Sequence, residues 1–238
     1  MVHPKKAFPR SLLPISLLLL AQWGWPGWFL LFQMDSVTRY VISVLSRFAL
    51  IGWALWLERG HWEDFFITRR NLKLTLRDGL GLAIAFVPIG WAYAHWRLGG
   101  VYWLPRQDWF PTLLAAFIPA GLQEELAYRG LFLGMLCERW GLSSFWSILV
   151  ITALFGPFHH RRYILRGDWL TLGLVTAFGG VAAWLTLKRR NMVGAVVGHT
   201  AMDFLNLLIH WREGFCSVIG AACVATGARA QVARTLSS

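Results

Sequence analysis

Charged residues and cysteines are both scarce in this chain of 238 residues. Asp, Glu, Lys and Arg make up only 15% of it, whereas 56% is hydrophobic and the mean hydropathy is +0.49. A soluble domain needs far less apolar sequence to build one core, so this balance indicates a membrane protein. The three cysteines, Cys137, Cys216 and Cys223, are widely spaced and form no Cys-x-x-Cys pair. They therefore argue against a disulfide framework and against a thiolate metal site.

Acidic residues are also few, since 12 Asp and Glu stand against 23 Lys and Arg, which leaves a formal net charge of +11. The basic residues do not form one stripe with aromatic platforms, so we expect no nucleic-acid partner. They gather instead between apolar runs, at the N-terminus, at 59–77, at Arg139 and at 188–190. The alternate loops carry Arg97, Arg106, Arg161, Arg162 and Arg166. By the positive-inside rule, this distribution favours a cytoplasmic N-terminus.

The N-terminal apolar stretch lacks the small-x-small cleavage site of a signal peptide and continues to Phe32, so we interpret it as a retained membrane span. A hydrocarbon core about 30 Å thick requires about 20 apolar residues per helix. Seven segments approach this length, at 12–33, 38–57, 79–97, 109–137, 142–160, 169–188 and 191–210. The predicted fold is all-α, a single polytopic membrane domain over residues 1–238. The stretch 215–225 leaves an eighth helix open, and Pro111 and Pro119 predict a tilted or broken fourth segment.

Tryptophan is abundant, and its positions favour anchoring at the two membrane interfaces. The tryptophans expected there are Trp23, Trp25, Trp28, Trp56, Trp62, Trp96, Trp103, Trp109, Trp140, Trp169 and Trp211.

Ionisable residues inside the apolar segments are the most informative feature, because each costs about 3 kcal/mol on insertion scales. The fourth segment contains Glu124, Glu125 and Arg129. Glu125 and Arg129 are four residues apart and are able to form an ion pair on one helix face, whereas Glu124 projects about 100° away. Glu124 is thereby left free to act as a general base. The alternative is an ion-pair network that only holds helices together.

Two further segments carry histidine. Gly156 and Pro157 loosen the fifth segment just before His159, so that its ring has access to a cavity, and His160 is the weaker candidate of the two. In the seventh segment, one polar stripe runs through His199, Asp203, Asn206 and His210. His and Asp four apart are able to share a metal ion, or the Asp is able to orient the His ring. The alternative is a structural stripe of interhelical hydrogen bonds.

Together these three pieces resemble the CAAX prenyl endopeptidase and bacteriocin-processing (CPBP, Abi) family, whose pattern is Glu-Glu-x-x-x-Arg, Phe-x-x-x-His and His-x-x-x-Asn or Asp. The matching residues are Glu124-Glu125…Arg129, Phe155…His159 and His199…Asp203, within a protease core of about 110–210. The resemblance implies a proteolytic site in a cavity among segments four to seven. By that resemblance Glu124 activates the attacking water, His159 helps to hold its proton, and Glu125 and Arg129 support the site. His199 and residue 203 stabilise the oxyanion.

Asp203 departs from the pattern, because many members have Asn there and an ionised carboxylate cannot donate a hydrogen bond to an oxyanion. Either Asp203 is protonated, or it acts indirectly by orienting His199 or a water molecule. Glu124, His159, His199 and Asp203 also form a plausible zinc ligand set. The compact His-Glu-x-x-His signature of metalloproteases is missing, however. We therefore expect a metal-independent glutamate mechanism that requires no cofactor, with zinc as the alternative.

The functional expectation is an endopeptidase that cleaves a membrane-associated protein or peptide. The resemblance implies prenylated CAAX proteins, bacteriocins or sorting tails as substrates, and a bacterial inner (plasma) membrane as its location. One rival is a transporter in which buried Glu, His and Asp relay protons or bind a cation, although no internal repeat supports it. Another is a noncatalytic immunity protein with the same fold.

Overall fold

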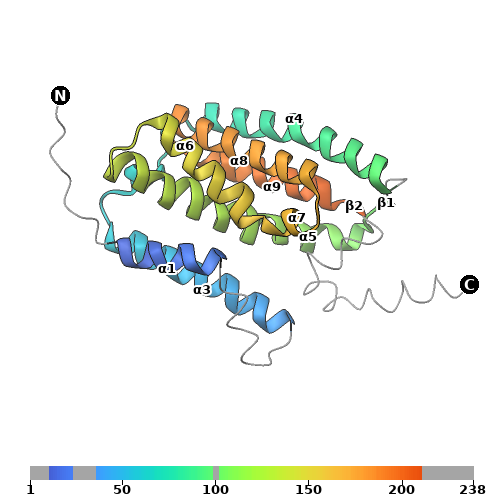
Figure 1. Ribbon diagram of the computed structural model, residues 1–238, viewed down its shortest axis with the longest axis horizontal. Coiled ribbons are helices and arrows are strands. Elements are labelled where there is room, and N and C mark those ends of the chain that lie inside the picture. The colour runs from blue at the N-terminus through green and yellow to red at the C-terminus, as the bar shows by residue number, and fades with distance from the viewer. Residues whose placement is uncertain (1–10, 24–35, 99–101, 211–238) are drawn as a thin grey trace, which may run out of the picture.

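A computed structural model describes residues 11–23, 36–98 and 102–210, and these are almost entirely helical (Figure 1). Within these ranges the only strands are β1 (Tyr102–Trp103) and β2 (Ile209–His210), which pair antiparallel. The predicted all-α class is therefore confirmed. The stretch 215–225, where an eighth helix was left open, lies outside the described residues.

Each of the seven predicted apolar segments overlaps a helix. The α-helices are α1 (Leu12–Trp23), α3 (Ser36–Leu57), α4 (Leu72–Leu98), α5 (Trp109–Ala115), α6 (Ser144–Ala153), α7 (Arg161–Leu165), α8 (Trp169–Arg189) and α9 (Val193–Leu207). Short 3₁₀ turns occupy η2 (Trp62–Phe65) and η3 (Arg106–Asp108). The second half of the first predicted segment lies outside the described residues. The seventh ends earlier than predicted, because the chain leaves α9 after Leu207 and forms β2.

The fourth segment is one continuous helix. Its prolines predicted a helix that is either tilted or broken, and the broken form is not found. After α5 the helix continues as the π-helical stretches η4 (Ala116–Glu124), η5 (Leu126–Phe132) and η6 (Met135–Arg139). Pro119 lies inside η4, and Pro157 lies inside a fourth π-helical stretch, η7 (Leu154–His159), which continues α6. A proline has no backbone N–H, so a carbonyl group in the preceding turn loses its usual hydrogen-bond donor. A π turn is wider than an α turn and brings a different backbone N–H to that carbonyl group. Both π-helical regions carry predicted site residues.

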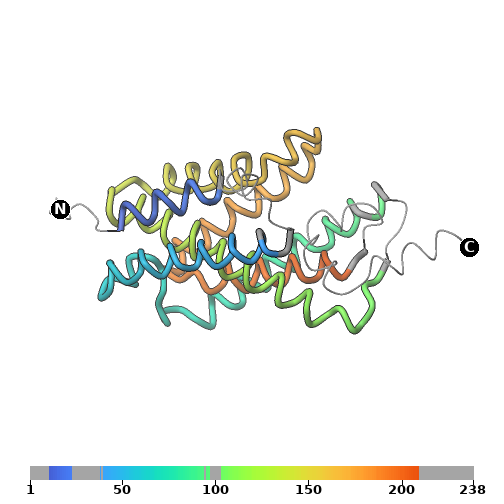
Figure 2. Tube along the Cα trace, turned by 90° about the horizontal axis from the view of Figure 1, so that it is seen from below, coloured from blue at the N-terminus to red at the C-terminus, as the bar shows by residue number. Residues whose placement is uncertain are grey.

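The long helices run along the long axis of the molecule (Figures 1 and 2), with α1 beside α3 and with α9 between α4 and η4. Glycines allow α4 and α9 to approach closely. A Cβ atom on Gly79 would lie 2.2 Å from the carbonyl oxygen of Gly194, and one on Gly198 would lie 2.9 Å from the carbonyl oxygen of Gly79. This Gly-x-x-x-Gly contact is typical of helices packed in membranes. It fixes the depth and rotation of His199, the residue after Gly198.

Two of the described helices are long and apolar enough to cross a membrane, over Tyr40–Leu57 and Trp169–Arg189. Leu12–Gln22 and Ser144–His159 are apolar but shorter. The described surface is rich in large exposed apolar side chains, and α3 buries few residues within the protein. So much exposed apolar surface is unusual for a soluble monomer and fits contact with lipid.

Exposed tryptophans lie near both ends of the long helices, as predicted for interfacial anchors. One end has Trp56, Trp62 and Trp140, and the other has Trp96, Trp103, Trp109 and Trp169. Trp25, Trp28 and Trp211 lie outside the described residues.

The loops at one end of the bundle are joined by a polar network. Arg189 Nε lies 2.6 Å from Asp78 Oδ2, and Arg139 Nη2 lies 2.8 Å from Glu58 Oε2. Ser11 Oγ donates to Glu58 at 2.8 Å. Further contacts there are Arg190–Glu138, Arg139–Asp64 and the bonds from Asn191 Nδ2 to the carbonyl oxygens of Thr68 and Arg70. The network thus collects the basic loops 59–77, 139 and 188–190 at the same end, as their alternation in the sequence predicted.

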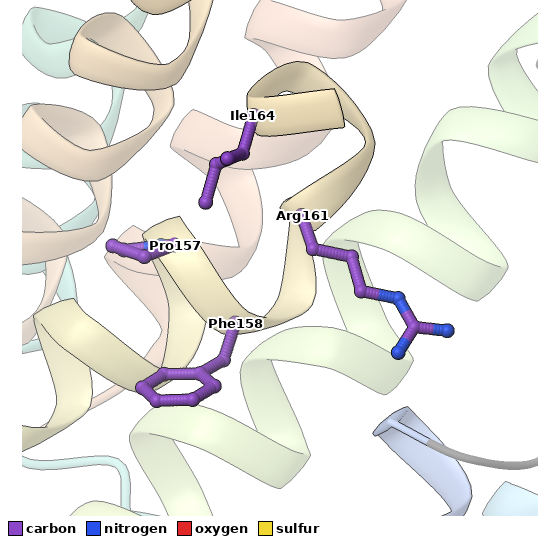
Figure 3. Close-up of a pocket in the computed structure, with 4 residues that line it drawn as sticks. All are labelled: Pro157, Phe158, Arg161 and Ile164. Atoms are coloured by element: carbon purple, nitrogen blue, oxygen red, sulfur yellow. The ribbon is translucent and has the colours of Figure 1, made fainter. Parts of the chain in front are cut away.

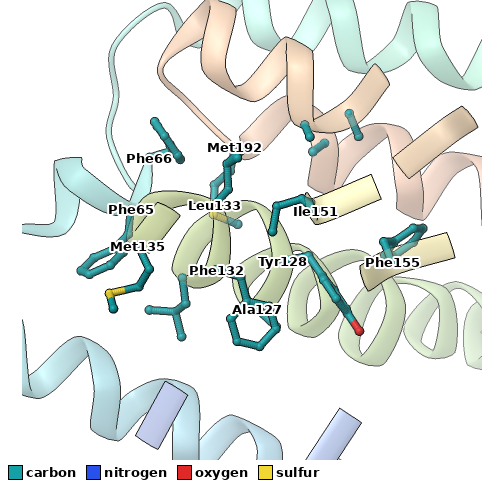
Figure 4. Packing of buried hydrophobic residues seen from close by; sticks show 14 of the residues in the cluster. Phe65, Phe66, Ala127, Tyr128, Phe132, Leu133, Met135, Ile151, Phe155 and Met192 are labelled. Atoms are coloured by element: carbon teal, nitrogen blue, oxygen red, sulfur yellow. The ribbon is translucent and has the colours of Figure 1, made fainter. Parts of the chain in front are cut away.

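A cluster of buried apolar side chains joins the π-helical segments to the elements packed around them, α8 among them (Figure 4). Tyr128, Leu131 and Leu133 contribute from η5 and its end, Phe155 from η7 and Phe178 from α8, all fully or almost fully buried. The rings of Tyr128, Phe155 and Phe178 in this core contact those of His159 and His199.

Candidate active site

Glu124 and His159 meet between two π-helical segments. Glu124 ends η4 and His159 ends η7, and Glu124 Oε1 lies 3.2 Å from His159 Nε2. Both side chains keep a small exposed fraction, 16% for Glu124 and 12% for His159. A carboxylate beside an imidazole, partly open to solvent, is able to take a proton from a water molecule and pass it on.

Glu125 faces a different, fully buried environment. Arg129 Nη1 donates to Glu125 Oε1 at 2.9 Å, so the ion pair that the four-residue spacing allows is formed. His199 Nδ1 lies 2.7 Å from the same oxygen. Because an ionised carboxylate only accepts hydrogen bonds, Nδ1 carries the hydrogen. Arg129 Nη2 donates to the carbonyl of Gly179 at 3.1 Å, which ties this group to α8. The two adjacent glutamates therefore have separate partners, as their angular separation predicted.

His199 and Asp203 lie one turn apart on α9. His199 Nε2 is 3.6 Å from Asp203 Oδ2, which is longer than a hydrogen bond. The residue that holds the His199 ring is thus Glu125, whereas Asp203 keeps 32% of its side chain exposed. The predicted polar stripe continues to Asn206, whose Oδ1 packs against Gly90 of α4. His210 is not part of it, since the chain has left the helix and forms β2 at that position.

Phe155 lies at the centre of these groups. Its ring centroid is 5.9 Å from that of His159, 5.1 Å from that of His160 and 5.8 Å from that of His199. The Arg129 guanidinium lies 4.1 Å from the same ring. An aromatic face attracts a cation, and the rigid ring separates the Glu124–His159 pair from the Glu125–Arg129–His199 group. This explains physically why a Phe precedes the histidine by four residues.

His160 comes closer to the site than the sequence indicated. Among the described residues, Glu124, His159 and His160 are the group whose potential metal-ligand atoms all lie within 4.8 Å of one another. His199 and Asp203, which the zinc alternative included, are not in that group.

Two further residues near the site were missed at the level of sequence. Arg47 lies in the stretch of α3 that is long and apolar enough to cross a membrane. Its Nε is buried without a hydrogen-bond partner among the described residues, and it is within electrostatic range of Glu124 and Tyr128. Its signal was a charged residue inside an apolar span. Tyr128 is fully buried, and its ring centroid lies 5.5 Å from that of His159. Its signal was weak, because a lone tyrosine in a core segment is ordinary.

A surface pocket of about 410 Å³ opens where η7 passes into α7 (Figure 3). Its lining includes Pro157, Phe158 and Ile164, with the guanidinium of Arg161 directed away from them. None of the predicted site residues is among those that line it. The pocket is mostly apolar, and one of its lining residues, Phe158, directly precedes His159 in the sequence.

Comparison with known proteins identifies the region that contains the site. Residues 106–205 match the family described as type II CAAX prenyl endopeptidase Rce1-like. No curated protein and no solved structure matches the chain. The matched region contains both glutamates, Arg129, Phe155, His159, His199 and Asp203. Together with the two helices able to cross a membrane, the match indicates an integral membrane protein. Residues 106–205 of this chain thus form a domain of the Rce1-like type II CAAX prenyl endopeptidase (CPBP/Abi) family.

Proposed function

We propose that this protein is an intramembrane endopeptidase in which Glu124 activates the attacking water. The observation that carries the proposal is the division between the two glutamates. Glu124 lies 3.2 Å from His159 with part of its carboxylate open, while Glu125 is buried and bound to Arg129 and His199. Such a division gives one carboxylate for chemistry and one for holding the site together.

The reaction begins when Glu124 takes a proton from a water molecule as that water attacks the carbonyl carbon of the scissile bond. The negative charge moves to the carbonyl oxygen. As the tetrahedral intermediate collapses, the proton held by Glu124 and His159 passes to the leaving nitrogen, and a carboxylate and an amine are released. No atom other than those of water and the peptide is consumed.

His199 is the proposed donor to the oxyanion. Its Nδ1 is engaged by Glu125, so the opposite nitrogen, Nε2, is oriented away from that buried pair. In the imidazolium form both nitrogens carry hydrogens, and Nε2 is then available to the oxyanion. Asp203 acts indirectly in this account. Its partly exposed carboxylate lies 3.6 Å from Nε2, and we assign it the role of keeping the His199 ring in this orientation and favouring the imidazolium form.

The proposed mechanism uses no resident metal ion. A carboxylate base and a protonated imidazole supply the two functions that zinc supplies in metalloproteases, which are activation of water and stabilisation of the oxyanion. A chelator should therefore leave the activity in place.

We further propose that all seven helical segments cross the membrane and that the end bearing the basic loops is cytoplasmic, in a bacterial plasma membrane. The collection of basic loops at one end and the tryptophans near both ends support this. The proposed substrate is a membrane-associated protein or peptide. The pocket of Pro157, Phe158 and Ile164 would accept an apolar side chain or lipid chain of the substrate.

Purified protein in proteoliposomes tests the function. Candidate peptides, prenylated or unmodified, are incubated in water enriched in ¹⁸O, with and without a chelator, and the products are identified by mass spectrometry. We expect cleavage at one bond with ¹⁸O in the new carboxylate, and this cleavage should persist in the presence of the chelator. Loss of cleavage on chelation, restored by zinc, would contradict the metal-free mechanism. Cation flux without any cleavage would favour the transporter.

A further inference from the structure

The end of η7 brings two consecutive histidines to one side of the chain. Neighbouring residues within a helix project about 100° apart, but His160 stands where η7 ends, with φ −96° and ψ 27°. The change of backbone direction brings the ring centroids of His159 and His160 to 4.7 Å, with the ring planes at 76°. Both rings thereby lie near the Glu124 carboxylate, and the potential ligand atoms of all three residues lie within 4.8 Å of one another.

Two nitrogens of these rings lack a partner. His159 Nδ1 and His160 Nε2 are buried and make no hydrogen bond to the described residues. Buried polar atoms are normally satisfied by protein, water or an ion, so orphaned nitrogens in a cluster with a carboxylate point to a missing ligand. The other nitrogen of His159, Nε2, lies 3.2 Å from Glu124 Oε1. This distance is close to the separation of about 3.3 Å between two ligand atoms on one tetrahedral zinc ion with bonds of about 2.0 Å.

We propose that Glu124, His159 and His160 bind a single divalent transition-metal ion, with Zn²⁺ as the best fit, and that this ion inhibits the enzyme. Two imidazoles and one carboxylate suit zinc and cobalt, whereas magnesium and calcium prefer sets made only of oxygen ligands. Three protein ligands leave a fourth position for water. The site differs from the catalytic set, because it contains His160 and excludes His199 and Asp203.

Inhibition follows from the identity of the first ligand and rests on the proposed function. A Glu124 carboxylate bound to zinc is no longer available to take a proton from the attacking water. Occupation of the site therefore removes the base while leaving the Glu125–Arg129–His199 group in place.

Metal binding is measured directly, so its result does not depend on activity. Protein purified without a histidine tag and stripped of metal is titrated with Co²⁺ and followed by visible absorption, and Zn²⁺ is then used to displace the cobalt. We expect one equivalent per chain. His160→Gln and Glu124→Gln should each weaken binding by roughly tenfold or more, since each removes a ligand. His61→Gln, a change at the exposed histidine just before η2, is the matched control and should bind like wild type. Thermal unfolding checks that each variant is folded.

Absence of cobalt or zinc binding to folded wild type, or equal binding by His160→Gln, would overturn the site. Proteolysis by the wild type measured over the same zinc range should fall as the site fills, and a rise would overturn the inhibitory role. Failure of the proposed function gives a different pattern, in which the metal binds with the expected dependence on His160 although no peptide is cleaved.

Discussion

The carboxylate of Glu125 lies 2.7 Å from Nδ1 of His199, across 74 residues of sequence, and the same oxygen accepts from Arg129. One atom thus joins the helix that carries Glu124 to the helix that carries His199. With the Arg129 bond to Gly179, the group links η5, α8 and α9. The distance between the proposed base, Glu124, and the proposed oxyanion donor, His199, therefore depends on this buried ion pair.

Replacing Arg129 should destabilise the protein strongly. Arg129→Met removes the guanidinium partner of the buried Glu125 carboxylate and leaves His199 as its neighbour, and loss of one partner of a buried ion pair costs about 3–5 kcal/mol. Thermal unfolding in detergent measures the effect. Arg77→Met is the matched control, because the Arg77 side chain is 69% exposed and its pair with Asp78 should contribute less than about 1 kcal/mol. Equal midpoints for the two variants would contradict the assigned role of Arg129.

Adding a methyl group at the α4–α9 contact should also destabilise the protein. A Cβ on Gly194 would lie 2.2 Å from the carbonyl oxygen of Thr75, so Gly194→Ala must push the two helices apart. We expect a loss of about 1–3 kcal/mol and reduced proteolysis, because His199 moves with α9. Gly52→Ala is the control, since no atom lies within 4 Å of its added Cβ. That variant should be neutral or gain up to about 1 kcal/mol of helix stability. A Gly194→Ala protein with the stability of wild type would contradict the close contact between α4 and α9.

The Phe155 ring is expected to matter for more than packing. Phe155→Leu keeps an apolar side chain of similar volume but removes the aromatic face beneath Arg129 and the ring contacts to the histidines. The stability loss should stay below about 1.5 kcal/mol, while kcat falls with little change in KM. Phe145→Leu, at a mostly exposed position of α6, should alter neither quantity. A Phe155→Leu enzyme with wild-type kcat would restrict the ring to a packing role.

Acid should weaken the polar network at the basic end of the bundle. The hydrogen bond from Arg189 lowers the pKa of Asp78 below its ordinary value of 3.8. A folded-state pKa below the unfolded one gives stability that is present above about pH 4 and is lost as the pH falls through the folded-state value. The gap in unfolding midpoint between wild type and Asp78→Asn should therefore be widest near neutral pH and close as the pH is lowered below 4. A gap that widens in acid would contradict this ion pair.

Local periodicity predicted much of this arrangement, because its cause lies within a few residues. The seven apolar segments follow from the length of the hydrophobic runs, and the Glu125–Arg129 pair and the separate direction of Glu124 follow from helical spacing. Contacts between distant segments could not be derived in this way. The partner of His199 is Glu125 and not Asp203, which depends on how α9 packs on the π-helical segment. The approach of His160 depends on the backbone at the end of η7, and the position of Arg47 depends on where α3 docks.

In the proposed mechanism Glu124 takes the proton from water, whereas Glu125 holds the helices together, and a pair of matched substitutions distinguishes the two roles. Glu124→Gln and Glu125→Gln are each assayed for peptide cleavage and for thermal unfolding, beside Glu63→Gln, an exposed control on η2. Glu124→Gln should unfold near the wild-type temperature and lose cleavage by a factor of about 10² or more, the contribution typical of a general base. Glu125→Gln should unfold at a clearly lower temperature. Cleavage at the wild-type rate by a folded Glu124→Gln protein would contradict the account.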